Sequence, residues 1–427
     1  MIDIKLIREN PEIYKKNNLK KDRDPKIIDR ILQLDKEWRT VKFEGDNLRR
    51  GRNKISEEIN KLKKTGNETK SKILIKEAKK IPEKLKNFEV KEKNIYDSLQ
   101  KELGKIPALM HLDVPQGKSD KDNVIRKILG KPKKFNFPLK NHVELIESLD
   151  VGDFDASAET SGTGFYYLKN DLALLNRALI NFTIDFMLKK GYQYIEPPLM
   201  VHKKIAEAAE DFEAFKTKIY KIQDEDFYLI PTAEHAILGM MTGKTISEEK
   251  LPLKVFGYSM CFRKEIGSHG IDEKGLWRTH QFNKIEQFIF CKPEDSWKYY
   301  DELKKNSEEI MKSLELSYRI IESCTGDLGD WKARGEDIEV WRPTTESYGE
   351  VMSLSNCVDS QARELNIRGV SKKGEYYVLH TLNNTAMATS RILVGILENN
   401  QQKDGSINIP KVLWKYMGGK KIIKKEK

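Results

Sequence analysis

Residues 262–290 read FRKEIGSHGIDEKGLWRTHQFNKIEQFIF, two alternating runs that flank a polar, glycine-containing connection from Ile266 to Gly275. This pattern is typical of two antiparallel strands joined by a long loop. Because successive side chains of a strand point to opposite faces, one face would be apolar, and the other would gather two arginines, a histidine, an aromatic ring and two carboxylates. The residues of this polar face are Arg263, Glu265, Arg278, His280, Phe282 and Glu286.

The polar face of this strand pair has the chemistry of a binding surface. A guanidinium group pairs with a phosphate or a carboxylate through two hydrogen bonds, and an aromatic ring offers a stacking surface for a base. Carboxylates beside them suit an amine or a hydroxyl group. Alternation alone leaves a second interpretation open, which is a solvated sheet face with ion pairs.

The size and charge of the chain set the outer limits. At 427 residues the chain exceeds one ordinary core, so two or more domains are expected. The net charge of +11, from 77 Lys plus Arg against 66 Asp plus Glu, suits an acidic polymer as partner, although a general lysine bias would look the same.

The cysteines and the N-terminus indicate a cytoplasmic protein. Cys261, Cys291, Cys324 and Cys357 are far apart and form no CxxC pair, so neither a zinc ribbon nor a disulfide framework is expected. The N-terminus does not have the order of a signal peptide, and no apolar run approaches the length of a membrane span. We therefore expect reduced core thiols.

Upstream of the strand pair, the sequence predicts a two-helix arm. Apolar residues recur with three-four spacing in two runs, separated by a polar turn at 65–67. This spacing favours two long helices, at about 27–64 and 69–103, that fold back as an antiparallel coiled coil. Pro82 is expected to kink or split the second helix.

The predicted arm is basic. Between Ile27 and Leu103 it holds 21 Lys plus Arg and 14 Asp plus Glu, a net charge of +7. An exposed two-helix arm has no room for a small-molecule pocket, but a basic one can lie along a phosphate backbone. A solvated coiled-coil exterior is the alternative. The lysines near the tip are Lys61, Lys63, Lys64, Lys70, Lys72, Lys76, Lys79 and Lys80.

The remaining sequence predicts a larger mixed domain. Four prolines between 106 and 141 indicate a linker, which separates an N-terminal domain at 1–105 from a larger domain at 142–420 and a basic tail at 421–427. Several strands with few parallel crossovers favour an α+β fold, a mostly antiparallel sheet flanked by helices. Helices are expected near 172–189, 235–241, 297–316 and 384–400, and strands near 192–199, 227–230 and 376–382.

Together these stretches resemble the catalytic domain of the class II aminoacyl-tRNA synthetases, and with the arm in front the whole chain resembles the seryl-tRNA synthetase family. Gly191 to Pro197 is similar to motif 1 of the class, Phe262 to Phe282 to motif 2, and Asn383 to Asn399 to motif 3. The Thr232-Ala233-Glu234 triplet, the HQFNKIEQF run and the segments ILENNQQ and IPKVLWKYMGG resemble the seryl branch. The larger domain would then be the class II catalytic domain.

The resemblance implies roles in binding ATP and magnesium. The catalytic residues would be Arg263, which bridges the α-phosphate and the serine carboxylate, and Arg391, which takes the γ-phosphate end. Phe282 would stack on adenine and Glu265 would accept from its exocyclic amine. Magnesium would be held by Glu350 and Ser353, since hard cations take oxygen ligands. The residues expected around ATP are Arg263, Lys264, Glu265, Arg278, Thr279, Phe282, Glu350, Val351, Met352, Ser353 and Arg391.

A second group of residues would bind serine. A site whose buried polar groups pair with the serine hydroxyl rejects alanine, because those groups would otherwise stay unpaired. Apart from the resemblance, these residues have ordinary interpretations: helix N-caps for the two threonines, a turn for the asparagine and lysine partners for the glutamates. The expected residues are Thr232, Ala233, Glu234, Arg263, Glu286, Asn383 and Thr385.

Some features depart from the family pattern. Thr385 and Met352 stand where many relatives have serine, which resembles the archaeal and eukaryotic branch. Glu350 and Ser353 have opposite parity on a strand, so they can face one metal only if a β-bulge intervenes. No Cys/His set supports the divergent zinc-dependent form of the enzyme.

The resemblance implies a homodimeric, magnesium-dependent ligase that forms seryl-adenylate and transfers serine to the 3′ end of tRNA(Ser), with tRNA(Sec) open as a second substrate. The basic arm would hold the tRNA, and the region around Pro197 would contact the second protomer. Two other functions stay open, a paralogue that binds RNA or protein without catalysis and an enzyme that charges a carrier protein. The intact motifs, with Arg263, Glu265, Glu286 and Arg391 all present, argue against a paralogue without catalysis. The arm argues against an enzyme that charges a carrier protein, which would not need it.

Overall fold

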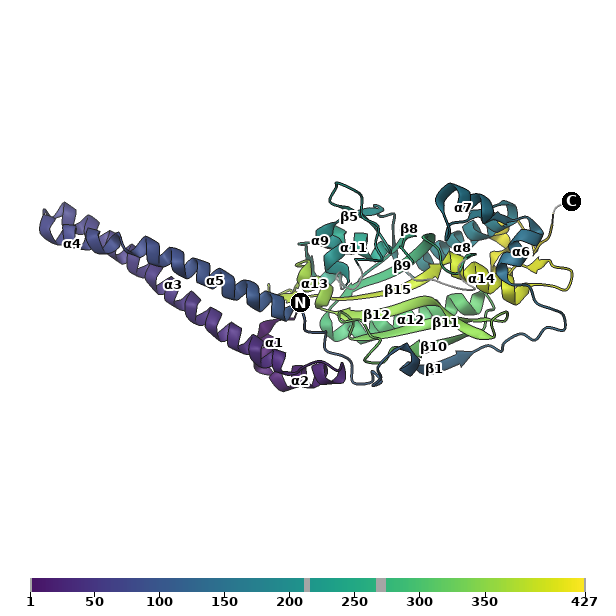
Figure 1. The fold of residues 1–427 in the computed structure, drawn as a ribbon, viewed down its shortest axis with the longest axis horizontal. Helices are drawn as coiled ribbons and strands as arrows, with labels where there is room; N and C mark the ends of the chain where they lie inside the picture. The colour runs from purple at the N-terminus through teal and green to yellow at the C-terminus, as the bar shows by residue number, and fades with distance from the viewer. Residues whose placement is uncertain (1, 211–215, 266–273, 426–427) are drawn as a thin grey trace. The chain divides into compact units, whose positions relative to one another are not determined.

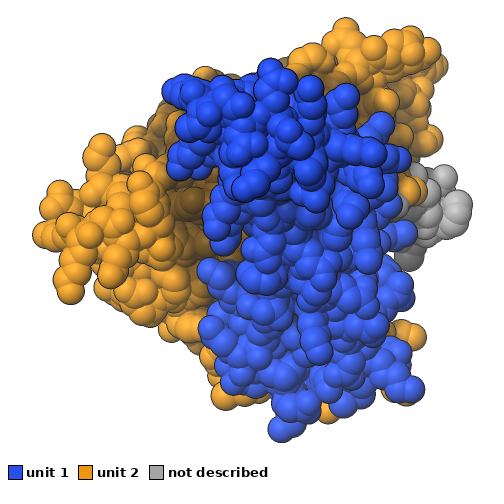
Figure 2. All heavy atoms as spheres, turned by 90° about the vertical axis from the view of Figure 1, so that its left-hand side faces the viewer, with its two compact units in different colours: residues 1–107 blue, residues 108–427 orange. Residues whose placement is uncertain are grey.

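The computed structural model describes residues 2–210, 216–265 and 274–425, and Figure 1 shows its ribbon. The chain divides into two compact units, Met1–Pro107 and Ala108–Lys427, which Figure 2 draws in different colours. Within the described ranges, no helix combines the length and the apolar character that crossing a membrane requires.

The first unit is built from helices. The 39-residue helix α3 (Lys26–Lys64) runs antiparallel to α5 (Ile81–Leu103), and the short α4 (Glu68–Ala78) lies at the tip (Figure 1). Pro82 stands in the first turn of α5, where its missing N–H leaves no helical hydrogen bond unmade. The sequence predicts that Pro82 kinks or splits the second helix; the helix is split, but at Lys79 and Lys80, just before Pro82.

Most of the buried surface of this unit lies at the base of the arm. Two short helices, α1 (Ile4–Glu9) and α2 (Pro11–Lys20), pack there on α3. Beyond Gly45, α3 contributes no buried side chain, so the distal arm is held by a narrow seam. The core at the base consists of Ile7, Tyr14, Ile28, Ile31, Leu99, Leu103 and Ile106.

The second unit contains an eight-stranded sheet with the order β1-β10-β11-β12-β15-β9-β8-β4. Neighbouring strands are antiparallel, except that β4 runs parallel to β8. The predicted α+β fold with a mostly antiparallel sheet is therefore confirmed. The strands are β1 (Val124–Leu129), β4 (Gln193–Ile195), β8 (Leu253–Phe262), β9 (Gln281–Cys291), β10 (Tyr318–Glu322), β11 (Arg334–Arg342), β12 (Ser347–Val358) and β15 (His380–Ala388).

Helices pack against this sheet because one stripe of each is apolar. Helix α12 contacts β12 and β15, helix α14 contacts β9 and β11, and helix α8 contacts β9 and β15. Their buried side chains join those of the strands in one large hydrophobic core. The helices of the unit are α6 (His142–Leu149), α7 (Asp155–Ser161), α8 (Asn170–Lys189), α9 (Lys203–Ala209), α11 (Ala233–Met241), α12 (Ser296–Ser313), α13 (Ser360–Glu364) and α14 (Thr389–Asn400).

Shorter elements complete the unit. Each small sheet pairs two or three strands that lie outside the main sheet. They are β2 (Gly152–Asp153) with β3 (Tyr167–Leu168), β5 (Met200–His202) with β6 (Phe227–Leu229), β7 (Thr245–Ser247) with β13 (Arg368–Val370) and β14 (Tyr376–Val378), and β16 (Ile407–Asn408) with β17 (Ile422–Ile423). The 3-10 helices are η1 (Asp120–Asp122), η2 (Glu248–Lys250), η3 (Pro293–Asp295) and η4 (Lys411–Met417).

Several segments differ from the sequence prediction. Residues 384–388, expected to begin a helix, continue β15, because they pair with β9 as far as Ala388 and tertiary pairing overrides local preference. Residues 124–129, expected in a linker, form β1 at the edge of the main sheet. Ile422 and Ile423, expected in a tail, pair with β16. The other domain limits remain predictions.

Replacing a core leucine tests this packing. Leu303 of α12 is fully buried, whereas Leu112 is 86% exposed. Leu303→Ala should lower the free energy of unfolding by about 2–5 kcal/mol, since it removes buried methyl groups and leaves a cavity. Leu112→Ala is the matched control. Thermal unfolding followed by circular dichroism measures both variants, and equal melting temperatures would contradict the packing.

Candidate active site

Two residues of the predicted polar face, Phe282 and Glu286, lie on β9, and the other four lie just beyond the ends of β8 and β9. Arg263 directly follows β8, and its backbone N–H donates to the carbonyl oxygen of His280 at 2.9 Å, so the two residues lie opposite each other. The guanidinium of Arg263 lies over the ring of Phe282, 5.3 Å from its centroid. Residues 266–273 of the predicted connection lie outside the described part of the chain.

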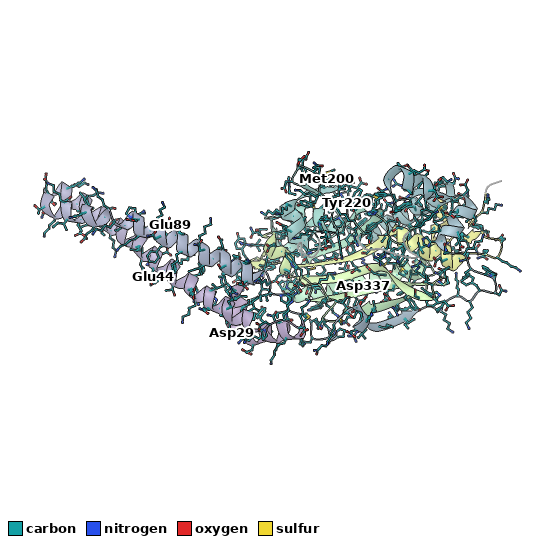
Figure 3. All side chains as sticks on the ribbon, in the orientation of Figure 1. Asp29, Glu44, Glu89, Met200, Tyr220 and Asp337 are labelled. Atoms are coloured by element: carbon teal, nitrogen blue, oxygen red, sulfur yellow. The ribbon has the colours of Figure 1, made fainter. Side chains whose placement is uncertain are left out.

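Two residues assigned to the polar face, Arg278 and His280, precede β9 rather than belonging to it. His280 Nδ1 lies 2.7 Å from the hydroxyl of Tyr220 and 3.0 Å from the carbonyl oxygen of Arg263; Figure 3 labels Tyr220. Arg278 forms an ion pair with Glu265 at 3.8 Å and is 47% exposed. These contacts join the ends of the two strands.

The first cavity is lined by β9, β12, β15 and the start of α14. Nη1 of Arg391 donates to the carbonyl oxygen of Glu350 at 2.8 Å and to its carboxylate at 3.2 Å. Burial acts to raise the pKa of Glu350, but the charges of Arg391 and Arg263 outweigh it and hold that pKa below its ordinary value. The predicted residues that line this cavity are Arg263, Glu265, Thr279, Phe282, Glu350, Val351, Ser353, Thr385 and Arg391.

A β-bulge in β12 brings Glu350 and Ser353 to the same cavity. Between Ile338 and Glu339 of β11 the pairing skips one residue of β12, Val351. The extra residue shifts the alternation of faces by one position. Both side chains therefore line the first cavity despite their opposite parity in the sequence.

A second, open cavity adjoins the first. The two share four lining residues, Arg263, Lys284, Glu350 and Ser353. The second cavity encloses about 1150 Å³ of empty space, open solvent included. The predicted serine-binding residues that line it are Thr232, Glu234, Arg263, Glu286 and Asn383, whereas Thr385 lines the first cavity.

Polar groups in the second cavity are already paired with one another. Oε1 of Glu234 accepts from Nε2 of Gln361 at 2.6 Å and from Nδ2 of Asn383 at 2.9 Å. Thr232 is the N-cap of α11, as its ordinary interpretation proposed, and its hydroxyl also accepts from Nζ of Lys284 at 3.1 Å. Asn383 lies on β15 rather than in a turn, because the strand extends through it.

Buried charge dominates the electrostatics of this cavity. Lys284 and Glu286 form an ion pair at 2.6 Å, with side chains only 9% and 1% exposed. Burial raises the pKa of Glu286. Burial, together with the charges of Glu210 and Glu286, raises the pKa of Glu234 to about 8. For Glu210 burial acts in the same direction, but its contact with His235 prevails and lowers its pKa to about 2.

The sequence analysis missed further lining residues, among them Lys284, Gln361 and Lys332. Lys284 has the same parity in β9 as Phe282 and Glu286, so alternation could have identified it. Gln361 comes from α13 and Lys332 from the segment before β11. No local pattern marks these two, because each enters the cavity from a distant part of the chain.

Four predicted residues line neither cavity. The ammonium group of Lys264 lies 5.6 Å from the ring centroid of Tyr220, and Arg278 contacts Glu265 as described above. Ala233 and Met352 are buried in hydrophobic clusters. Their assignment to serine or ATP stays a prediction.

Oxygen donors suited to magnesium meet at the bulge. Among the described residues, no three His, Cys, Asp or Glu side chains are grouped so that they could hold a metal ion. Glu350 and Ser353 nevertheless face one cavity, and Asp337, labelled in Figure 3, pairs with Ser353 across β11 and β12. Burial and the charge of Glu350 raise the pKa of Asp337 to about 7. A divalent cation would relieve this repulsion, so the donor set fits magnesium completed by water or phosphate oxygens.

A mostly antiparallel sheet with two arginines, an aromatic ring and buried carboxylates around adjoining cavities agrees with the predicted catalytic core of a class II aminoacyl-tRNA synthetase. The family model "tRNA synthetase class II core domain (G, H, P, S and T)" matches residues 215–400, and the model "Seryl-tRNA synthetase N-terminal domain" matches residues 1–110. The serine–tRNA ligase of Methanospirillum hungatei is 44% identical, over 99% of this chain and 100% of the relative. The chain therefore belongs to the seryl-tRNA synthetase family.

Solved structures agree with this assignment over the full length. The seryl-tRNA synthetase from Pyrococcus horikoshii, complexed with ATP, is 42% identical with a TM-score of 0.93 and full coverage of both chains. The cytoplasmic serine–tRNA ligase from Naegleria fowleri, in complex with AMP, is 34% identical with a TM-score of 0.89, over 100% of this chain and 99% of that one. The resemblance inferred from the motifs is confirmed.

The raised pKa of Glu234 predicts a pH-dependent stability. Its pKa is about 8 in the folded chain against an ordinary 4.5, so the folded state holds an extra proton between these values. The contribution of Glu234 to stability therefore falls as the pH rises from about 4.5 to 8. The melting temperature of Glu234→Gln should exceed that of the wild type, and the difference should grow as the pH rises over this range. Each kcal/mol of stability gained raises the melting temperature by about 2–4 °C.

The matched control is Glu249→Gln, since the side chain of Glu249 is 65% exposed. Melting temperatures are measured at pH 4, 6 and 8.5 for the three proteins. A constant difference between Glu234→Gln and wild type across this range would contradict the raised pKa.

Proposed function

We propose that the two cavities of this serine–tRNA ligase bind ATP and serine side by side, and that Arg263 joins them. The observation that supports this proposal is that Arg263 lines both cavities. A guanidinium at the junction can hold the α-phosphate and the serine carboxylate together. Attack of the carboxylate on the α-phosphorus then needs only positioning and stabilisation of spread negative charge.

The first cavity has the groups that ATP requires. Phe282 supplies an aromatic surface for adenine, and Glu265 supplies an acceptor for its exocyclic amine. Arg391 binds the γ-phosphate end. Glu350 and Ser353 hold magnesium, which supplies charge neutralisation when bound. Glu350 in turn orients Arg391 through two hydrogen bonds.

The second cavity has the groups that select serine. Glu286 and Glu234 offer carboxylates for the ammonium group, and Thr232 and Asn383 offer polar groups near it. Alanine would leave such polar groups without their hydroxyl partner, so it is rejected more strongly than size alone allows. Thr385 contributes from the first cavity, where its side chain hydrogen-bonds Glu286.

The N-terminal unit binds tRNA, as its family model implies. We assign that contact to the basic coiled-coil arm and propose tRNA(Ser) as the partner, while tRNA(Sec) remains open. Lys61, Lys63 and Lys64 lie in the last turn of α3 and are exposed. Exposed cations on a stiff helix pair suit a phosphate backbone.

A second copy of the chain is the proposed partner of the motif 1 region. Three large apolar side chains around Pro197 are exposed: Tyr194 at 36%, Leu199 at 38% and Met200 at 46%, of which Figure 3 labels Met200. A dimer interface would bury them. The cytoplasm remains the proposed location.

Serine-dependent exchange of pyrophosphate into ATP tests the assignment of Arg263 and Glu286. Arg263→Ala and Glu286→Ala should each reduce exchange by at least about 10²-fold, because each removes a charge that the reacting groups require. Arg368→Ala and Glu249→Ala change exposed residues of the same types and serve as matched controls. Robust exchange in either site variant would refute its assignment. Serine, alanine, threonine and glycine are compared as substrates.

Charge reversal at the tip tests the arm. Lys63→Glu with Lys64→Glu should raise the KM for tRNA by about tenfold, since phosphate contacts are lost, and leave exchange unchanged. The matched control reverses Lys372 and Lys373, an exposed pair in the second unit. An unchanged KM for tRNA in the tip variant would place the contact elsewhere.

A further inference from the structure

A buried polar network joins α6 to α14 and to the segment before β9. His142, the first residue of α6, is 2% exposed, and its Nδ1 lies 3.2 Å from Oε1 of Glu398. Its Nε2 accepts a hydrogen bond from the backbone N–H of Leu276 at 3.2 Å. Because Nε2 accepts, a neutral imidazole carries its proton on Nδ1 and donates it to Glu398.

The backbone is shaped to allow this contact. Gly275 has a φ of +125°, and a Cβ there would lie 2.2 Å from Nε2 of His142, so no larger residue fits. Gln401, just after α14, exchanges two hydrogen bonds of 3.0 Å with the backbone of Lys140. The end of α14 thus fixes the start of α6, where His142 lies.

The network continues to Arg391 through Trp277. Nε of Arg391 donates to the carbonyl oxygen of Trp277 at 3.3 Å, and the two guanidinium groups of Arg342 and Arg391 lie 4.1 and 5.5 Å from its ring centroid. Nη2 of Arg342 lies 3.8 Å from Oε1 of Glu398. Gly349 packs against the ring, since a Cβ there would lie 2.2 Å from Cζ2 of Trp277. Glu398 therefore contacts His142, which accepts from the backbone next to Trp277, and Arg342, which lies over the ring of Trp277.

We propose that His142 and Glu398 are positioning residues for ATP, which act through Leu276 and Trp277 to orient Arg391 in the first cavity. Neither residue lines either cavity, so neither is assigned a contact with substrate. This inference deepens the proposed function and rests on its assignment of Arg391 to ATP. Because Trp277 and Arg391, where the network meets the first cavity, do not line the second cavity, disturbing it changes the KM for ATP and leaves the KM for serine alone.

Two amide variants of His142 separate its two hydrogen bonds. The amide of asparagine occupies the Nδ1 side of an imidazole, so His142→Asn keeps a donor for Glu398 and loses the acceptor for Leu276. The longer glutamine places its amide at the Nε2 side, so His142→Gln keeps the acceptor. We expect His142→Asn to raise the KM for ATP about tenfold, which corresponds to about 1.4 kcal/mol, and His142→Gln to stay within about threefold of wild type. His202→Asn, at an exposed histidine, is the matched control.

The exchange assay measures KM for ATP and for serine in each variant, with melting temperatures to confirm folding. An unchanged KM for ATP in His142→Asn, or equal rises for ATP and serine, overturns the proposal. If His142→Asn does not fold, Glu398→Gln replaces it. We then expect a higher KM for ATP and an unchanged KM for serine, and a rise in both KM values would overturn the proposal. Arg391→Ala separates a failure of this inference from a failure of the proposed function. An unchanged KM for ATP in Arg391→Ala refutes the assignment of Arg391 to ATP, whatever the His142 variants show.

Discussion

The interaction on which the site depends is the ion pair between Lys284 and Glu286, held on one face of a buried strand. The two residues stand two positions apart on β9, so their side chains leave the same face, and they meet at 2.6 Å with side chains only 9% and 1% exposed. Two buried charges are stable only when their remaining hydrogen-bonding capacity is met. Thr232 meets part of it for Lys284. Removing one partner would leave an uncompensated buried charge.

The main sheet keeps this arrangement rigid, because β9 has a neighbour on both sides. β8 brings Arg263 to the end of the strand, and β15 brings Asn383 and Thr385 across from it. The arrangement is not optimised for stability, since Glu234 is buried beside two other carboxylates and its pKa rises to about 8. The buried polar groups of the second cavity are available to a ligand with an ammonium group and a hydroxyl.

The two units differ in whether their functional charges are buried or exposed to solvent. The second unit removes charges from water and keeps them in fixed geometry, which suits the recognition of a small substrate. The first unit keeps its charges in solvent on a narrow helical seam, whose packing is concentrated near Ile28, Ile31 and Leu99. Solvated cations spread along a helix can follow a polyanion without a precise pocket. Loss of the distal arm would therefore leave the chemistry of the second unit in place.

Local periodicity and the helix-breaking Pro82 determined the arm and its split second helix, the β8–β9 strand pair and the shared face of Phe282 and Glu286, because each depends on residues close together in the chain. The same periodicity could have identified Lys284. Only the tertiary structure decided that 384–388 is a strand, that a bulge at Val351 turns Glu350 and Ser353 to one cavity, and that Gln361 reaches Glu234. Pairing along β9 outweighs local helix preference, and a bulge changes parity without a mark in the sequence. Contacts between distant segments arise from the packing of whole elements, which a local pattern does not encode.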